Sequence, residues 1–303
     1  MVVFLSPRST TKAQRTRRLH REEAAISSST LSSSDPIRPS KRFGQHFLHD
    51  RNIIGKIISA FDPRQDETVV EIGPGTGALT STLVERAARV VAIEFDRKLI
   101  DPLLAQFGNR DNFRLVEADA LDADICDLIK PAPNTRLVAN LPYNISTAIL
   151  QRLIEQRCIT EMVLMLQKEV VDRMLAPAGS SDRGYLSVVV EAYCETEKLF
   201  DVSPGAFRPP PKVWSTVVRL ERRPQIKSGV RDEELLWRLV SAGFAQKRKT
   251  ILNNLRNSTG PLQQRVKDNG GASIVLCKAE VDVQRRAETL TFEEWVRIIN
   301  ALT

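Results

Sequence analysis

The chain has 303 residues, which is long enough for one large and one smaller domain. Of these residues 42% are hydrophobic and 27% charged, which is typical of a globular protein. It contains no apolar run near the roughly 20 residues that cross a bilayer, so we expect no membrane span. The formal net charge is +7, but residues 43–206 carry 17 Lys/Arg against 24 Asp/Glu, whereas residues 207–267 carry 14 against 4. Clustered cations favour binding of a polyanion, although a solvated basic surface explains the charge equally well.

Residues 1–40 are rich in Ser, Thr and Arg and show no apolar periodicity, so we expect this basic extension to be disordered. Its short apolar start precedes the basic residues, which fits a secretory signal poorly. An organellar transit peptide and an extension upstream of the natural start both stay open, although Glu22 and Glu23 count against the first. We expect a cytoplasmic protein, with an organellar matrix as the alternative.

Short β-branched runs alternate with helical patterns from residue 68 onwards. The runs that predict strands are 68–72, 89–95, 113–119, 136–142 and 161–167. The patterns that predict helices between them are 78–87, 96–107 and 146–156. This alternation predicts an α/β fold in which helices cover a parallel sheet.

The pattern changes towards the end of the chain. Residues 185–194 and 214–222 predict further strands that close the sheet with an antiparallel edge. Beyond Arg231 the apolar residues recur with helical periodicity, and Thr291 is placed to cap a last helix. We therefore expect a small helical domain from about residue 230.

Neither the cysteines nor the histidines show the spacing of a metal site. The cysteines are scattered, at Cys126, Cys158, Cys194 and Cys277. They predict reduced thiols in a reducing compartment. His46 and His49 are three residues apart but lack further ligands, so we expect no metal.

A glycine-rich turn follows the first predicted strand. It contains Gly73, Gly75 and Gly77 in a G-x-G-x-G pattern, and a helical pattern begins at residue 78. Glycine allows a tight turn and the close approach of a ligand where a Cβ would clash. The turn indicates a nucleoside cofactor, and by itself it also admits a nicotinamide dinucleotide.

Polar side chains end the next predicted strands. Glu94 ends the second, 21 residues after Gly73, where a carboxylate can accept both ribose hydroxyls. Asp119 ends the third and is placed to accept from an adenine amine, and the sequence Asn-Leu-Pro-Tyr (140–143), which has no use in hydride transfer, ends the fourth. Each acid alone could be a solvated strand end, but ligands of open α/β sheets bind where these strands end.

These motifs resemble the 16S rRNA adenine dimethyltransferase family, from about residue 39 to the C-terminus. The resemblance implies a Rossmann-like S-adenosylmethionine-dependent methyltransferase sheet with a small C-terminal helical domain. Residues 41–229 would form the cofactor-binding catalytic domain, and residues 230–303 a helical domain that contacts RNA. S-adenosyl-L-methionine is the implied cofactor.

Several positions match the family's cofactor-binding motifs, beginning with the segment KRFGQHFL at residues 41–48. His46 and Leu48 would contact the methionine part of the cofactor, Glu94 its ribose, and the segment from Asp119 its adenine. The full set that the resemblance assigns to the cofactor is Gln45, His46, Leu48, Gly73, Gly75, Glu94, Asp119, Ala120 and Asn140.

The residues Asn140, Leu141, Pro142 and Tyr143 resemble the family's catalytic signature. A sulfonium methyl group is already activated, so an enzyme that transfers it has to orient the acceptor. The exocyclic amine of adenine is a poor nucleophile, because its lone pair is delocalised into the ring. The side-chain oxygen of Asn140 and the main-chain oxygen of Leu141 can accept the two amine hydrogens, while Tyr143 stacks on the base and Pro142 stiffens the turn. A simple strand-to-helix turn is the structural alternative.

Two further segments resemble RNA-contacting parts of the family. In FRPPPKV (207–213), Phe207 would face Tyr143 across a flipped base, with Arg208 and Lys212 near phosphates, although a rigid linker is equally compatible with the prolines. The sequence departs from the family at Trp214, where an acid is usual. The contact that this acid makes in the family is therefore not expected here, and we expect the Trp214 side chain simply to pack. In the second segment, a basic helical one, the residues expected to contact RNA or else to form a solvated face are Lys247, Arg248 and Lys249.

The resemblance implies a monomeric enzyme that dimethylates two adjacent adenosines in a hairpin loop near the 3′ end of small-subunit rRNA, within a pre-30S-like particle. One alternative keeps the chemistry but acts on large-subunit rRNA, as the macrolide-resistance methyltransferases do. A second alternative is an assembly or transcription factor with a vestigial cofactor pocket, against which the intact Glu94, Asp119 and Asn140 argue.

Overall fold

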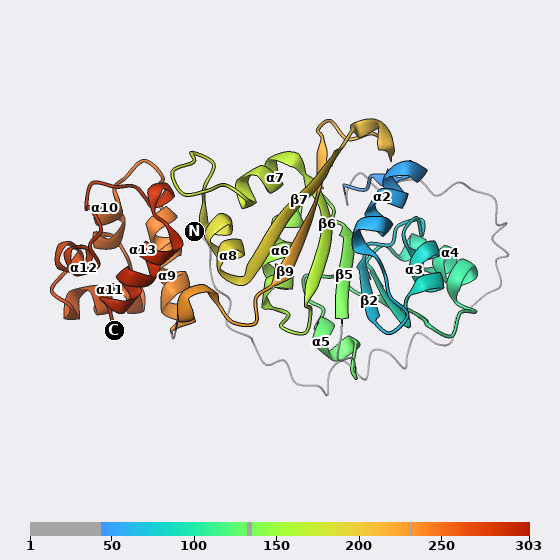
Figure 1. Cartoon of the computed structure of the whole chain (residues 1–303), viewed down its shortest axis with the longest axis horizontal. Helices are drawn as coiled ribbons and strands as arrows, with labels where there is room; N and C mark the ends of the chain where they lie inside the picture. Colours follow the sequence, from blue (N-terminus) through green and yellow to red (C-terminus); the bar gives the residue numbers. More distant parts are fainter. Residues whose placement is uncertain (1–43, 132–134, 231) are drawn as a thin grey trace, which may run out of the picture. The chain divides into compact units, whose positions relative to one another are not determined.

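The computed structural model describes residues 44–131, 135–230 and 232–303. Within these ranges, seven strands form one sheet in the order β4-β3-β2-β5-β6-β9-β7. Figure 1 labels β2, β5, β6, β9 and β7 of this sheet. Its parallel strands are β2 (Thr68–Ile72), β3 (Arg89–Glu94), β4 (Phe113–Glu117), β5 (Thr135–Asn140) and β6 (Glu161–Gln167). The antiparallel edge consists of β9 (Ser215–Arg222) and β7 (Cys194–Val202). The predicted α/β fold with a parallel sheet is confirmed.

Helices cover both faces of this sheet, which explains why its strands are nearly continuous apolar runs. Val69 belongs to a core cluster with α2 (Arg51–Phe61), α3 (Thr80–Arg86) and α4 (Arg97–Phe107). Its neighbour Val70 points to the opposite face, as alternate strand residues must. The helices on that second face are α5 (Ile125–Leu128), α6 (Ser146–Glu155), α7 (Lys168–Met174) and α8 (Tyr185–Tyr193).

The strand predicted over residues 185–194 is wrong. Residues Tyr185–Tyr193 form helix α8, and β7 begins only at Cys194. The helix starts after Gly184, whose N–H donates to the side chain of Ser187 at 3.0 Å. Its valine-rich middle is buried on two sides, with Val189 in the sheet core and Val188 against the C-terminal helices. A helix buried on most sides loses the amphipathic pattern that distinguishes it from a buried strand.

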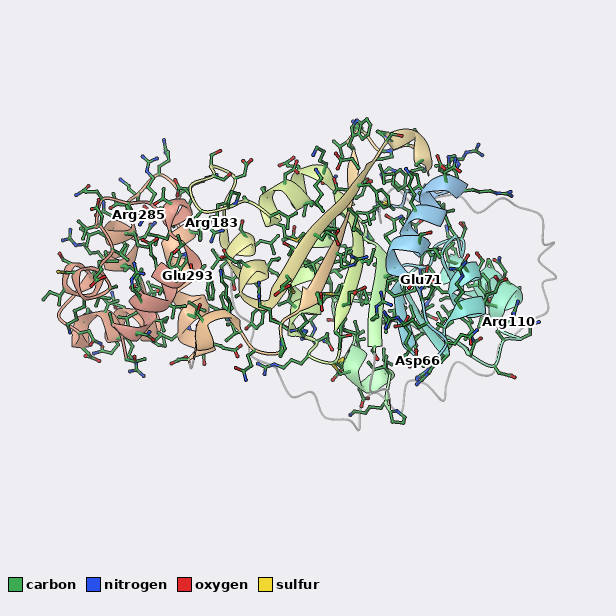
Figure 2. All side chains as sticks on the ribbon, in the orientation of Figure 1. Asp66, Glu71, Arg110, Arg183, Arg285 and Glu293 are labelled. Atoms are coloured by element: carbon green, nitrogen blue, oxygen red, sulfur yellow. A yellow bond between two sulfur atoms is a disulfide. The ribbon has the colours of Figure 1, made fainter. Side chains whose placement is uncertain are left out.

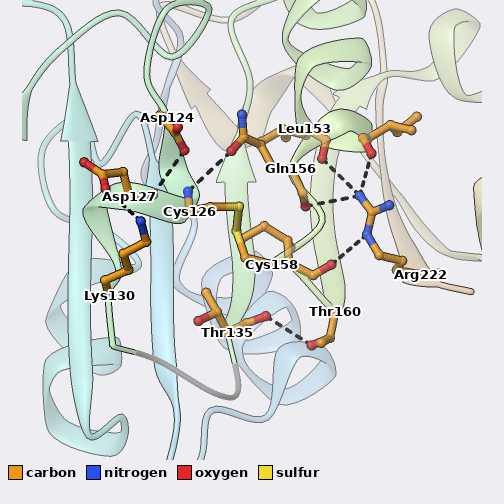
Figure 3. Close-up of a disulfide and its surroundings, with 12 residues drawn as sticks. Asp124, Cys126, Asp127, Lys130, Thr135, Leu153, Gln156, Cys158, Thr160 and Arg222 are labelled. Carbon is orange, nitrogen blue, oxygen red and sulfur yellow. Dashed lines mark hydrogen bonds and ion pairs between the residues drawn. A yellow bond between two sulfur atoms is a disulfide. The ribbon is translucent and has the colours of Figure 1, made fainter. Parts of the chain in front are cut away.

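Two of the cysteines predicted as reduced thiols instead form a disulfide. Cys126, in α5, is bonded to Cys158, which follows α6, and their Cα atoms lie 5.5 Å apart (Figure 3). The main-chain N–H of Cys126 also donates to the Gln156 side chain at 3.3 Å, so a second link holds the same two segments together. The bond closes a loop between residues 32 positions apart, which by chain entropy is worth about 3 to 4 kcal/mol. Cys194 and Cys277 are free.

The C-terminal helices pack around Trp295, which is fully buried. They are α9 (Glu233–Phe244), α10 (Ile251–Arg256), α11 (Gly260–Asp268), α12 (Ala272–Lys278) and α13 (Phe292–Asn300). The predicted cap of the last helix is confirmed, because the Thr291 hydroxyl accepts from the N–H of Glu294 at 3.3 Å. At Gly243 a Cβ would lie 2.4 Å from the Trp295 ring, so the close approach of α9 requires glycine.

Residues 1–40, for which we expected disorder, lie outside the described ranges. In the part of the chain that the structure covers, no helix combines the length and apolar character needed to cross a membrane.

Candidate active site

A cavity of about 280 Å³ lies where the parallel strands β2, β3 and β5 end. Its wall also includes the loop after β4 and the segment that precedes α2. Within the described residues it brings together all nine positions that the sequence assigned to the cofactor, from Gln45 to Asn140. This is the edge at which open α/β sheets bind ligands.

The turn after β2 forms the floor of the cavity. Gly73 and Gly75 have φ angles of +67° and +60°, in the left-handed region that favours glycine. A Cβ on Gly75 would also come within 3.2 Å of the Phe47 ring. The turn therefore depends on glycine both for its conformation and for the space beside Phe47.

Glu94 is held by three main-chain donors at the end of β3. Its carboxylate accepts from the N–H groups of Asp96 at 2.8 Å, Phe95 at 3.0 Å and Gly75 at 3.3 Å. Burial raises the pKa of Glu94, and these hydrogen bonds only partly oppose the shift. The side chain is thus fixed before any ligand arrives, and its remaining lone pairs can accept from ligand hydroxyls.

Glu71, in β2, is only 2% exposed. Its side chain is labelled in Figure 2. Burial raises its pKa to about 7, and the nearby carboxylate of Glu94 adds to the shift. The Thr80 hydroxyl donates to the Glu71 carboxylate at 2.6 Å, and this hydrogen bond opposes the rise in pKa. Glu71 therefore ties β2 to α3 beneath the glycine turn, a role that its sequence position alone does not reveal.

Asp119 lies in the loop after β4, because the strand ends at Glu117 rather than at the predicted residue 119. Its Oδ1 accepts from the N–H of Leu121 at 2.9 Å, which orients the carboxylate, and Oδ2 can accept from a ligand amine. Ala120 lines the cavity beside it.

Asn140 ends β5, and its side-chain nitrogen donates to the main-chain oxygen of His46 at 3.2 Å. Because the amide nitrogen is used in this way, the amide oxygen is the atom that can accept from a ligand. The N–H of Leu141 donates to the oxygen of Met165 at 3.2 Å, which holds the main chain of the signature to β6. Asn140, Leu141, Pro142 and Tyr143 all line the cavity.

Tyr143 is held by two contacts on different elements. Its ring stacks on that of His46, with centroids 5.2 Å apart and an interplanar angle of 29°. Its hydroxyl lies 2.5 Å from the hydroxyl of Ser215, at the start of β9. Burial raises the pKa of Tyr143, so the phenol is neutral at physiological pH.

The segment that precedes α2 and the proline-rich loop meet beside the cavity. Strand β1 (Phe47–Leu48) pairs antiparallel with β8 (Phe207–Arg208), and His46 Nδ1 lies 2.7 Å from the main-chain oxygen of Pro209. Two motifs that are about 160 positions apart in sequence thus form one short ribbon. No local sequence pattern indicates this pairing.

Phe207 does not line the cavity, in which we expected it to face Tyr143 across a base. Its side chain is 1% exposed and belongs to the core cluster that contains Leu48, rather than to the cavity wall. The ring is drawn into the core because β8 pairs Phe207 with Leu48 and turns the neighbouring Arg208 outward. A base-stacking role for Phe207 would require the ring to leave this core.

The basic residues assigned to RNA are exposed. Arg208 ends β8, and Lys212 lies on the loop between β8 and β9. Lys247, Arg248 and Lys249 lie between α9 and α10, and not in a helix as expected, because α9 ends at Phe244 and α10 begins at Ile251. A further exposed cation that sequence reasoning missed is close by. The N–H of Ile251 donates to the oxygen of Arg285 at 2.8 Å, which brings the neighbouring Arg286 to the same loop.

Across the three described ranges, no group of three or more His, Cys, Asp or Glu side chains is arranged to hold a metal ion. The glycine turn after β2, the fixed acid at the end of β3 and the Asn-Leu-Pro-Tyr signature at the end of β5 define a Rossmann-like methyltransferase. A family model described as ribosomal RNA adenine dimethylase matches residues 38–301, so the chain belongs to the ribosomal RNA adenine dimethylase family.

Known relatives agree with this assignment. A protein of Pseudomonas aeruginosa named ribosomal RNA small subunit methyltransferase A is 44% identical over 266 residues, 88% of this chain and 95% of the relative. Its namesake in Hahella chejuensis is 42% identical over 261 residues, 85% of this chain and 90% of the relative.

Solved structures also resemble this chain over most of its length. A dimethyladenosine transferase from Plasmodium falciparum has a TM-score of 0.69 and 28% identity, covering 84% of this chain and 96% of that one. The 23S rRNA methyltransferase ErmE has a TM-score of 0.62 and 29% identity, covering 84% and 99%.

Proposed function

We propose that this enzyme transfers methyl groups from S-adenosylmethionine to N6 of two adjacent adenosines in a hairpin loop near the 3′ end of 16S rRNA, giving N6,N6-dimethyladenosine during small-subunit biogenesis. The observation that carries the proposal is the hydrogen bond from Asn140 to His46, which commits the amide nitrogen and leaves the amide oxygen as the acceptor.

The residues around the cavity fit the proposed cofactor. The fixed carboxylate of Glu94 can accept the two ribose hydroxyls, and Asp119 can accept from the adenine amine. The glycine turn has no side chains at Gly73 and Gly75, which both line the cavity, so a ligand can approach its main chain closely. The segment with Gln45, His46 and Leu48 would hold the methionine part. When bound, S-adenosylmethionine supplies an activated methyl group on a sulfonium.

The chain's own task is to hold and orient the acceptor amine. Asn140 Oδ1 and the main-chain oxygen of Leu141 accept the two N6 hydrogens, which favours a pyramidal nitrogen with its lone pair available. Tyr143, with its ring and hydroxyl both held, offers a surface on which the base stacks. Neither acceptor is a base strong enough to keep the proton that N6 loses, so this proton passes to water.

Single-stranded loops present unstacked bases, which suits an adenosine that must enter a cavity. The exposed cations Arg208, in β8, and Lys212, in the loop after it, lie beside the cavity. The loop with Lys247, Arg248 and Lys249 offers a second basic surface. We infer that the substrate is small-subunit rRNA in a pre-30S-like particle and that the enzyme acts as a monomer.

We place the reaction in the cytoplasm, with an organellar matrix as the alternative. The Cys126–Cys158 disulfide is uncommon for the cytoplasm, where cellular reductants keep most cysteines reduced.

The test is to incubate the enzyme with labelled cofactor and undermethylated small subunits, with large subunits and 23S rRNA in parallel, and then to map the modified nucleotides. We expect dimethylation of two adjacent adenosines near the 3′ end of 16S rRNA. Label on 23S rRNA alone would contradict the proposed substrate, and the absence of label on either RNA would contradict the enzymatic function.

A further inference from the structure

Trp214 is a large aromatic side chain that the structure leaves in solvent. It is 52% exposed, and the preceding Val213 is 44% exposed. The chain's other tryptophans are covered, since Trp295 is fully buried and Trp237 is half-buried against Tyr193. The indole therefore contributes little to the core, which argues against the packing role that its sequence position allowed.

The main chain on both sides of Trp214 is held firmly beside the site. The Trp214 oxygen accepts from the N–H of Lys168 at 2.9 Å, and the next residue, Ser215, contacts the Tyr143 hydroxyl at 2.5 Å. Because β9 runs antiparallel to β6, its first residues lie at the same sheet edge as the end of β5, which carries Asn140. Two strand spacings, about 10 Å, separate β5 from β9.

The charge around Trp214 suits an RNA backbone. Arg208, in β8, and Lys212, in the loop that leads to Trp214, are exposed, and the sequence has no acid between Asp201 and Glu221. Two of the acids near Lys168, Asp172 and Asp201, are paired with lysines. Lys168 lies 3.1 Å from Asp172, and Lys198 lies 3.3 Å from Asp201.

We propose that Trp214 is a stacking platform for the nucleobase next to the target adenosine, so that it positions the RNA strand while Tyr143 contacts the target base. This inference rests on the proposed function, because it requires a single-stranded RNA substrate at the cavity. An indole accepts any base on its face, so the platform contributes affinity and strand position rather than sequence readout. Loss of one base stack corresponds to a roughly 5- to 100-fold weaker interaction.

Intrinsic tryptophan fluorescence tests the contact directly. The protein is titrated with a hairpin RNA that carries the two adjacent adenosines. We expect quenching that is largely lost in Trp214→Phe, because Trp295 is fully buried and Trp237 is half-buried against Tyr193. In methylation assays, Trp214→Ala should raise KM for the RNA roughly 5- to 100-fold with a smaller effect on kcat, whereas Trp214→Phe should stay close to wild type. Leu104→Ala, which removes an exposed apolar side chain from α4, is the matched control.

Two results would overturn the proposal. One is a Trp214→Ala variant with wild-type affinity for the hairpin. The other is a Trp214→Ala variant that binds the hairpin normally but binds assembled subunits weakly, because Trp214 would then contact a ribosomal protein rather than a nucleobase. A wild-type enzyme that binds the hairpin with quenching of its tryptophan fluorescence, but does not methylate small subunits, would contradict the proposed function and leave the Trp214 contact intact.

Discussion

The side-chain nitrogen of Asn140 donates to the main-chain oxygen of His46 across 3.2 Å, although the residues are 94 positions apart. This bond joins the segment expected to hold the methionine part of the cofactor to the signature expected to hold the target amine. It also fixes which end of the amide is available for catalysis. A rotation of this side chain would exchange an acceptor for a donor and remove the grip on the amine.

Asn140→Ala should reduce kcat by roughly 100-fold or more, because it removes one of the two acceptors that orient N6. The affinity for hairpin RNA should change little, because phosphate contacts lie elsewhere. Single-turnover methylation and RNA binding measured on the same preparation check this. Asn52→Ala, an exposed substitution in α2, is the matched control, and unchanged turnover in Asn140→Ala would remove the catalytic assignment.

Tyr143→Ala should weaken productive RNA binding by about 1–3 kcal/mol through loss of base stacking. Tyr143→Phe retains the ring but loses the contact with the Ser215 hydroxyl, so it should be affected much less. KM and kcat measured for both variants separate the two contributions. Equal losses in Tyr143→Phe and Tyr143→Ala would mean that the hydroxyl, rather than the ring, is what the enzyme needs.

Glu94→Ala should raise the dissociation constant of the cofactor roughly 10- to 100-fold, since a buried charged acceptor is removed. Glu94→Gln keeps one acceptor oxygen and should be intermediate. Isothermal titration calorimetry with S-adenosylmethionine measures both. Glu117→Gln, at the exposed end of β4, is the control, and a wild-type dissociation constant in Glu94→Ala would contradict the ribose assignment.

Replacing Lys247, Arg248 and Lys249 together with Ala should weaken RNA binding and make its salt dependence shallower by about 2 in the log–log slope. The control is a triple substitution of exposed cations that are already paired with acids, namely Lys130, Arg157 and Arg238. Filter binding over a range of salt concentrations gives both slopes. If the two triple variants behave alike, the loop has no special role in RNA binding.

The buried carboxyl of Glu71 should make the stability of the free protein depend on pH. Its pKa is raised from 4.5 to about 7 in the folded state, so between these values folding takes up a proton. Stability should therefore fall as pH rises through this window, by roughly 3 kcal/mol in total, and the loss is complete above about pH 7.

Glu71→Gln cannot ionise, so its Tm should vary less between pH 5 and 8 than that of the wild type. Thr80→Val removes the hydrogen bond that favours the ionised carboxylate of Glu71. In this variant the fall in stability should therefore extend to higher pH than in the wild type. Thermal unfolding of the three proteins at matched pH values makes the comparison. Parallel curves for Glu71→Gln and wild type would show that Glu71 keeps its ordinary pKa.

The sheet could be predicted from the sequence because strands buried on both faces are short continuous apolar runs, as in β2 and β6. The cavity wall could be predicted because a parallel sheet brings its strand ends together, so Gly73, Glu94 and Asn140 meet without any knowledge of packing. Local rules of this kind need only the order of the elements.

The features that sequence reasoning missed all depend on tertiary packing. The sequence pattern of α8 predicts a strand because this helix is buried on two sides. The Cys126–Cys158 bond joins segments that only the fold brings together. The inward turn of Phe207 follows from its pairing with Leu48, and the exposure of Trp214 depends on how β9 begins. None of these is encoded in a local pattern.

The ribbon of β1 and β8 joins the segment expected to hold the methyl donor to a segment expected to contact RNA. Its two residue pairs connect the stretch leading into α2 with Phe207 and Arg208. We therefore expect a shift that admits one ligand to move the surface proposed for the second. By linkage such a coupling is reciprocal. If the bound methyl donor changes the RNA affinity by some factor, bound RNA changes the affinity for the methyl donor by the same factor.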